Sequence, residues 1–245
     1  MSLLIPVISG IIVALLVDYL SDVLPVSRRF TRPVCSVCHQ PYTIMDYAVF
    51  HRCSKCGNRT LTRFIIILIP AVVLSILVKF FPFSTLSFWA SLPILILLGV
   101  IMVIDIEHRA VLVETSLLGF VLFLIYGIIL RGFLRTILGG LVGFLTMYLI
   151  YGLGKAFSRI AGRLRHQSID EVAFGFGDVT TGTILGLLVG WPAIFRAMTI
   201  SFLLFGAFTL ILFFALLLTK KYSAFSNALP FTPFLIIGAI AIFYL

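Results

Sequence analysis

Long apolar runs dominate this chain and restrict what it can fold into. Eight of them occur, at roughly 3–23, 64–81, 86–106, 111–130, 133–156, 178–192, 195–219 and 229–245. Most reach the roughly 17–25 residues that a helix needs to cross the hydrocarbon core of a bilayer. Charged residues make up only 11% of the chain, whereas a soluble domain carries about 25%. The sequence therefore predicts an all-α polytopic membrane protein with about eight transmembrane helices.

The net charge of +9 is distributed unevenly between the loops. If the loops after the first, third, fifth and seventh runs are cytoplasmic, they hold 14 of the 18 lysines and arginines. An excess of basic residues on the cytoplasmic side is the usual mark of orientation in membrane proteins. The sequence therefore predicts an N-terminus outside the cytoplasm. The basic charge reports topology in this interpretation, and nucleic acid is not an expected partner.

Two aspartates interrupt apolar runs at positions where charge is costly. Asp105 lies near the end of the third run and Asp178 begins the sixth, so the predicted topology brings both to the cytoplasmic face. An ionisable residue inside a membrane helix is a candidate for function, and two carboxylates that share a proton can hydrolyse a peptide bond. We expect the pair to face each other across a water-accessible pocket. Helix dipoles favour Asp178 as the base and Asp105 as the acid.

All four cysteines lie in one polar segment between the first two runs. They form two C-x-x-C pairs, Cys35 with Cys38 and Cys53 with Cys56. This spacing is typical of a structural zinc site, and a segment this short needs such support because it cannot build an ordinary core. A reducing cytoplasm disfavours disulfides, which stay as an alternative beside an iron–sulfur or redox role. His39 and His51 adjoin the pairs and are interpreted as exposed loop residues.

Glycines surround the second aspartate. Gly175 and Gly177 precede Asp178, and we expect them to let backbone approach an extended substrate and to allow unusual dihedrals. Three more glycines follow at intervals of four residues and predict close helix packing: Gly182, Gly186 and Gly190. Pro230 and Pro233 precede the last helix. They either support the backbone of a substrate or only shape the entry to that helix.

Other acidic residues are weaker candidates. Asp18 and Asp22 lie four residues apart at the inner end of the first run. They form a competing catalytic pair, contact a basic substrate segment, or belong to a solvated helix end, which is the favoured interpretation. Glu107 and His108 mark the end of the third run, and we consider for them a supporting role beside Asp105.

These residues together resemble the motifs of bacterial type IV prepilin peptidases, which are GxGD intramembrane aspartic proteases. The motifs are I-D at 104–105, G-F-G-D at 175–178, L-P-F-T-P-F at 229–234 and the two C-x-x-C pairs. The resemblance covers most of the chain from Cys35 to Leu245. It implies that Asp105 and Asp178 are the catalytic residues.

The resemblance also implies a substrate and a place. The enzyme would cleave the basic leader from prepilins or pseudopilins at the cytoplasmic face of the bacterial inner membrane. Many members also methylate the new N-terminus with S-adenosylmethionine. The chain would then comprise a helix at 1–23, a small cytoplasmic four-cysteine zinc module at 24–63 and a seven-helix membrane peptidase body at 64–245.

The chain departs from the family pattern at several positions. The stretch Ala110 to Glu114 lacks the usual proline-containing element, and Thr180 stands where a lysine is common. The usual G-S-F-x-N-V element near the N-terminus is not recognisable. These differences concern substrate preference and methylation, and both aspartates are present. Two alternatives stay open, an ion- or proton-coupled membrane transporter and a catalytically silent assembly protein for pili or secretion.

Overall fold

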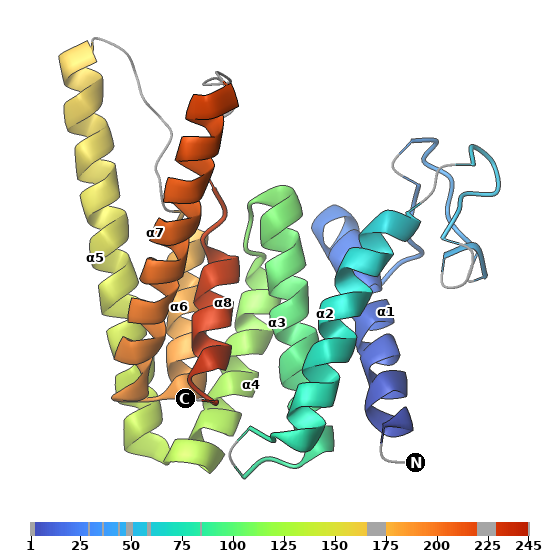
Figure 1. Ribbon diagram of the computed structural model, residues 1–245, viewed down its shortest axis with the longest axis horizontal. Coiled ribbons are helices and arrows are strands. Elements are labelled where there is room, and N and C mark those ends of the chain that lie inside the picture. Colours follow the sequence, from blue (N-terminus) through green and yellow to red (C-terminus); the bar gives the residue numbers. More distant parts are fainter. Residues whose placement is uncertain are drawn as a thin grey trace. The chain divides into compact units, whose positions relative to one another are not determined.

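The computed structural model is built from α-helices. It describes residues 3–28, 30–35, 37–43, 45–47, 51–57, 60–83, 85–165, 175–219 and 229–244, with the backbone alone for 160–165 and 219. The helices are α1 (Leu4–Ser27), α2 (Leu61–Phe80), α3 (Phe88–His108), α4 (Val113–Arg131), α5 (Phe133–Arg165), α6 (Phe176–Val189), α7 (Ala193–Thr219) and α8 (Thr232–Ala241) (Figure 1). Within those ranges β-structure is limited to isolated bridge positions, and Val34 and Pro41 form one such pair. The all-α prediction is confirmed.

Six of these helices are long and apolar enough to cross a membrane, so the chain is a multi-pass membrane protein. The other two, α6 and α8, have 14 and 10 residues and are shorter than the predicted spans. The apolar run of α6 is interrupted because Gly190 adopts a positive φ of 74° and a proline follows two residues later. Similarly, α8 begins only at Thr232, after Pro230.

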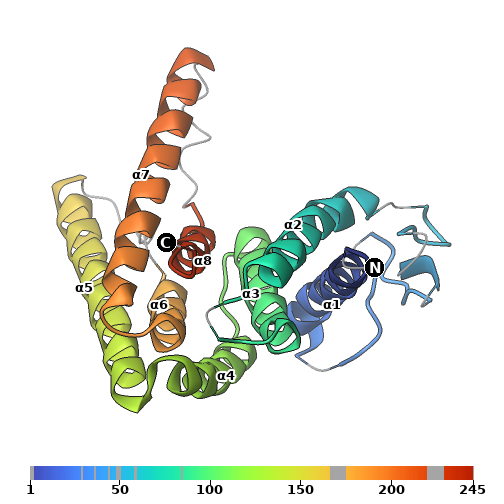
Figure 2. The same cartoon turned by 60° about the horizontal axis from the view of Figure 1, so that its bottom comes forward.

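The chain divides into two compact units, Met1–His108 and Arg109–Leu245. In the first unit, α1 packs against both α2 and α3, as the two views of the ribbon show (Figures 1 and 2). The approach of α1 to α2 is close at Gly10, where a Cβ would lie 2.7 Å from the Cα of Val72. Directly beside this contact, the hydroxyls of Ser9 and Ser75 hydrogen-bond to each other at 2.9 Å. Small residues therefore set the spacing of these helices.

In the second unit, α6 packs against α4, α5, α7 and α8 and is buried along most of its length. Its contact with α5 depends on glycines that face each other: a Cβ on Gly186 would collide with the backbone of Gly139, and one on Gly143 with the carbonyl of Gly182. Gly190 also lies against the backbone of Gly139. The predicted close packing at these glycines is confirmed, and it fixes the helix that carries Asp178.

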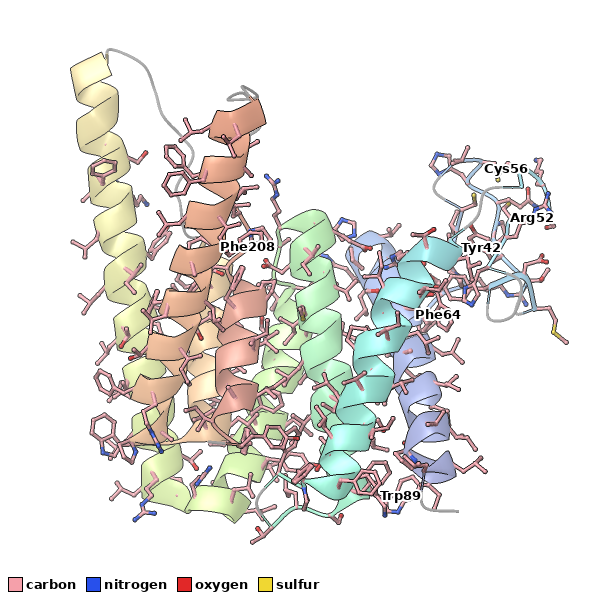
Figure 3. All side chains as sticks on the ribbon, in the orientation of Figure 1. Tyr42, Arg52, Cys56, Phe64, Trp89 and Phe208 are labelled. Atoms are coloured by element: carbon pink, nitrogen blue, oxygen red, sulfur yellow. The ribbon has the colours of Figure 1, made fainter. Side chains whose placement is uncertain are left out.

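The cysteine-containing segment between α1 and α2 adds a small satellite to the first unit. Cys35, Tyr42, Tyr47 and Cys53 form its buried cluster, and Tyr19 of α1 packs against that cluster. Figure 3 shows Tyr42 and Cys56 in this segment, and Trp89 at the start of α3, at the other end of the helices. The segment therefore lies at one end of the helices of its unit.

Candidate active site and metal centre

Asp178 is the third residue of α6, and the start of that helix holds its carboxylate. The N–H of Gly175 donates a hydrogen bond to Asp178 Oδ2 at 3.0 Å, and the N–H of Asp178 donates to the carbonyl of Gly175 at 3.1 Å. An acidic side chain that reaches back to the N-cap residue in this way satisfies one of the free N–H groups of the first turn. Asp178 is only 8% exposed. The helix N-terminus thus offers a donor where its dipole also favours an anion.

A second donor to Asp178 comes from a residue that the sequence did not single out. The hydroxyl of Thr232, the first residue of α8, donates to Asp178 Oδ1 at 3.2 Å. Thr232 lies between the two prolines of the motif at 229–234, and this position was the only available signal. Pro233 occupies the first turn of α8, where proline is tolerated because its missing N–H is not needed. A substrate-supporting role for Pro230 and Pro233 stays a prediction.

The two glycines before Asp178 differ in what they do. Gly175 has φ −81° and ψ 161°, which is ordinary extended backbone, and the first contact of an added Cβ there would be 3.8 Å away. Gly177 has no positive φ either, so the expectation of unusual dihedrals is wrong for both. A Cβ on Gly177, however, would lie 2.7 Å from Val111 Cγ2. Close approach of two chain segments is therefore what Gly177 provides.

Asp105 lies in the last turn of α3 and is 6% exposed. Glu107 follows it in the same turn, and His108 ends the helix with an exposed side chain. Asp105 belongs to the first compact unit and Asp178 to the second. The pairing of their carboxylates concerns both units and stays a prediction, as does support of Asp105 by Glu107 and His108.

A guanidinium organises the acidic residues at this end of the first unit. Arg63, at the start of α2, contacts Asp18 Oδ1 at 2.7 Å and Asp22 Oδ1 at 2.8 Å from α1. It also donates to both carboxylate oxygens of Glu107, at 2.6 and 3.0 Å, and to Ser21 Oγ at 2.8 Å. Asp18 is 1% exposed, so the favoured interpretation of a solvated helix end is wrong for it. Arg63 thereby connects the ends of α1, α2 and α3.

The cysteine-containing segment joins this polar cluster through one side chain. The hydroxyl of Tyr47 donates to Asp22 Oδ2 at 2.6 Å, and its ring packs edge-on against Tyr42 at 5.5 Å. Burial, together with the nearby charges of Asp22 and Asp18, raises the pKa of Tyr47 above its usual range. The phenol therefore stays protonated and remains a donor at physiological pH.

The four cysteines come together as their spacing predicts. Their Sγ atoms all lie within 4.8 Å of one another, and no disulfide joins any two of the four. The sulfurs are 3.6 Å apart between Cys35 and Cys56 and 3.5 Å between Cys38 and Cys53. Thiolates about 2.3 Å from a tetrahedral zinc ion would be about 3.8 Å apart, so the donor set and its spacing fit such an ion.

Backbone groups prepare these sulfurs to act as ligands. Hydrogen bonds from the backbone at Cys38 and then at Val37 lower the pKa of the Cys35 thiol to about 6, against the opposing effect of burial. Backbone hydrogen bonds at Cys56 and Lys55 lower the pKa of Cys53 in the same way. Thiolates are the form that binds metal. The backbone of the two C-x-x-C pairs therefore favours the deprotonated, metal-binding form of these cysteines.

The neighbouring histidines behave differently from each other. His39 is exposed, as predicted. His51 is only 3% exposed and stacks on Phe64 with ring centroids 4.0 Å apart, so the prediction of exposure is wrong for this residue. Burial lowers its pKa. Among the described residues, the candidate metal ligands are the four cysteines, and neither histidine belongs to that group.

Comparison with known proteins adds one match. The model of the Type IV leader peptidase family matches residues 92–216, just over half of the chain. No curated protein and no solved structure matches. The matched region contains Asp105 and Asp178 together with Gly175 and Gly177. It therefore covers both candidate carboxylates, and the cysteine cluster precedes it.

Proposed function

Because this chain belongs to the type IV leader peptidase family and is a multi-pass membrane protein, we propose that it is an aspartic endopeptidase for prepilin-like proteins. Asp105 and Asp178 are its catalytic pair. Cleavage removes a basic leader at the cytoplasmic face of the bacterial inner membrane, with the N-terminus of the enzyme outside. The observation that carries the proposal is the buried carboxylate of Asp178, held at a helix N-terminus inside the family-matched region.

The proposed mechanism assigns a different task to each carboxylate. Asp178 accepts hydrogen bonds from Gly175 and Thr232, which favours its ionised form, so it takes the proton from water. Asp105 lies near a helix C-terminus, where the dipole disfavours an anion, and donates a proton to the scissile carbonyl oxygen. The resulting hydroxide oxygen adds to the carbonyl carbon and gives a gem-diol. The C–N bond then breaks as Asp178 gives the proton it took from water to the leaving amine and Asp105 takes back a proton from a diol hydroxyl.

The cysteine cluster has a structural task in this proposal. Cys35, Cys38, Cys53 and Cys56 would hold a zinc ion, as their separations within 4.8 Å allow. A closed site of four thiolates leaves no open position for substrate or water. The ion would therefore hold the shape of the segment between α1 and α2, while the reaction takes place at the aspartates.

The first test is cleavage of a prepilin-type substrate by the purified protein in detergent. We expect D105N and D178N each to reduce the rate by about 10²–10⁴-fold or more, since each removes a general acid or base. The matched control is D46N, which removes a carboxylate from the cysteine-containing segment and should leave the rate unchanged. An unmodified protein that leaves several prepilin-type substrates intact would contradict the proposal and favour a transporter or a silent assembly protein.

Mass spectrometry of the cleaved product extends this test. The mass gives the cleavage position. A further 14 mass units, about the mass of one added CH₂, on the new N-terminus in the presence of S-adenosylmethionine would reveal the methylation that many family members perform. An unchanged mass with complete cleavage would assign this chain the peptidase activity alone.

A further inference from the structure

We propose that Thr232 is a positioning residue for the reaction, which fixes the carboxylate of Asp178 and stabilises its ionised form. The inference rests on the proposed function, because it assumes that Asp178 is the catalytic base. It adds a residue outside the family-matched region, which ends at residue 216.

The two carboxylate oxygens of Asp178 each have their own donor. The Thr232 hydroxyl binds Oδ1 at 3.2 Å, and the N–H of Gly175 binds Oδ2 at 3.0 Å. Thr232 is fully buried and Asp178 is 8% exposed. The carboxylate cannot rotate without breaking one of these bonds. Its plane, and hence the direction of its free lone pairs, is therefore fixed by donors from two different segments.

Aromatic packing holds the threonine in place. Phe231, directly before it, stacks on Phe202 of α7 with ring centroids 5.2 Å apart. Phe234 contacts Phe205 and Phe208 of α7, each at 5.3 Å between centroids; Figure 3 labels Phe208. Further along α8, a Cβ on Gly238 would collide with α7 at Ser201. The start of α8 is therefore fixed against α7, and the Thr232 hydroxyl is held on the carboxylate.

The hydrogen bonds matter because no ion pair within the described residues stabilises the anion. Glu114 lies at the start of α4, next to the segment that Gly177 contacts through Val111. Lys155 lies in the second half of α5, beside the Tyr151 ring that packs against Phe176. Among the side chains that the structure describes, the other charged ones on the helices around α6 are Arg131 of α4, Arg135 and Arg159 of α5 and Arg196 of α7. None of these residues pairs with Asp178, and α8 carries no charged residue.

Loss of the hydroxyl should therefore have a specific effect on the pH dependence of cleavage. A hydrogen bond to a carboxylate stabilises its ionised form, and bonds to charged groups are among the stronger ones. In the pH profile of kcat, the acid limb is the fall in rate at low pH, where the base becomes protonated. In T232V we expect the midpoint of this acid limb to move to higher pH by about one to two units. At neutral pH kcat should fall by about 10-fold or more, while KM should change little because Thr232 is fully buried and acts through Asp178. T232S keeps the donor and should restore both kcat and the acid limb.

Two controls separate this effect from simple damage to the fold. T199V removes a hydroxyl of α7 that bonds the carbonyl of Phe195, and its pH profile should match that of the unmodified protein. The thermal unfolding midpoint of each variant shows whether it is folded. If T232V does not fold, T232A removes the same hydroxyl without an added methyl group and gives the same comparison with T232S.

The outcomes are distinguishable from failure of the proposed function. If the protein cleaves its substrate and D178N abolishes cleavage, but folded T232V or T232A keeps the original acid limb and kcat, only the inference about Thr232 is overturned. If T232S shows the same shift as T232V, the hydroxyl is not responsible and the inference is also overturned. If D178N itself cleaves normally, the proposed function fails and this inference fails with it.

Discussion

At the scale of single residues, Gly177 lies where two chain segments come close together beside the candidate base. A Cβ there would be 2.7 Å from Val111 Cγ2 and 3.1 Å from Val111 Cβ. Contacts this short force one segment to shift, and a shift at Gly177 moves the next residue, Asp178. The glycine is therefore needed for room and not for its backbone angles.

This contact predicts that the activity lost in one substitution can be restored by a second substitution at the contacting residue. We expect G177A to reduce cleavage by about 10-fold or more, because small displacements of a catalytic group are costly. Trimming the partner in the double variant V111A/G177A should recover a large part of that loss. The measurement is kcat/KM for a prepilin-type substrate.

A matched control for that prediction lies in α5. An added Cβ on Gly152 would meet nothing within 4 Å, so G152A should cleave at the original rate. If V111A/G177A is no better than G177A, steric contact with Val111 is not the reason that glycine is needed.

The sequence indicated much about individual residues but not their partners. The spacing of the cysteines predicted their convergence, because two C-x-x-C pairs leave few other arrangements. Arg63 was counted only as a basic residue that marks topology, yet it contacts three carboxylates from two other helices. The bond from Thr232 to Asp178 joins residues 54 positions apart. Such contacts depend on how helices pack, and no local pattern contains that information.

At the scale of elements, Arg63 joins the ends of three helices. The side chain of Arg63 is 21% exposed, and the side chain of Asp18 that it contacts is 2% exposed. A carboxylate this deeply buried is stable as an anion only while its partner is present. The contacts of Arg63 with Asp18, Asp22 and Glu107 therefore contribute to the packing of α1, α2 and α3. Because Glu107 lies in the same turn as Asp105, they also contribute to the position of that turn.

The losses of stability on removing Arg63 and on removing the charge of Asp18 should not be additive. We expect R63M to lower the free energy of unfolding by about 3 kcal/mol, since it leaves buried charge unpaired. D18N/R63M should lose less than the sum of the two single variants, because the unpaired carboxylate is then absent. Unfolding in detergent followed by circular dichroism measures both. Equal losses in R63M and in R159M, which changes an exposed residue of α5, would contradict this account.

Helix positions were predictable to within a few residues for most of the chain, because long apolar runs are a strong signal. The main exception is α5, which continues to Arg165, well beyond the predicted end at 156, and α6 and α8 are shorter than their predicted runs. Their apolar composition extends beyond the helices, while Gly190 and Pro230 end or delay the helical backbone. The division of the chain after His108 had no sequence signal, since apolar helices on both sides of it look alike.

At the scale of the whole molecule, the cysteine segment should depend on its metal. We expect about one zinc ion per chain, and C56S should abolish its binding because a tetrahedral site needs all four thiolates. S54A, which changes a residue between Cys53 and Cys56 that is not a ligand, should retain the metal. Elemental analysis of the purified variants tests this. Two disulfides found by mass spectrometry in the protein prepared under reducing conditions would contradict it.

The same site should respond to acid in a defined direction. The Cys35 thiol has its pKa lowered from 9.0 to about 6 in the folded protein. The stability that its thiolate adds is therefore complete above pH 9 and is lost as the pH falls through about 6. Metal retention, measured by dialysis at a series of pH values, should accordingly decline on the acid side of neutrality and persist on the alkaline side. Retention unchanged down to about pH 4 would contradict the assignment of these thiolates as ligands.

The hydrogen bond between Thr232 and Asp178 also has a consequence for biosynthesis. A ribosome makes α6 well before α8, so a nascent chain that has emerged only as far as α7 contains Asp178 without its second donor. The carboxylate reaches its final surroundings only when the last helix folds against α7. Co-translational insertion therefore leaves the candidate base incomplete until late in synthesis, and an unfinished chain in the translocon lacks the arrangement on which hydrolysis depends.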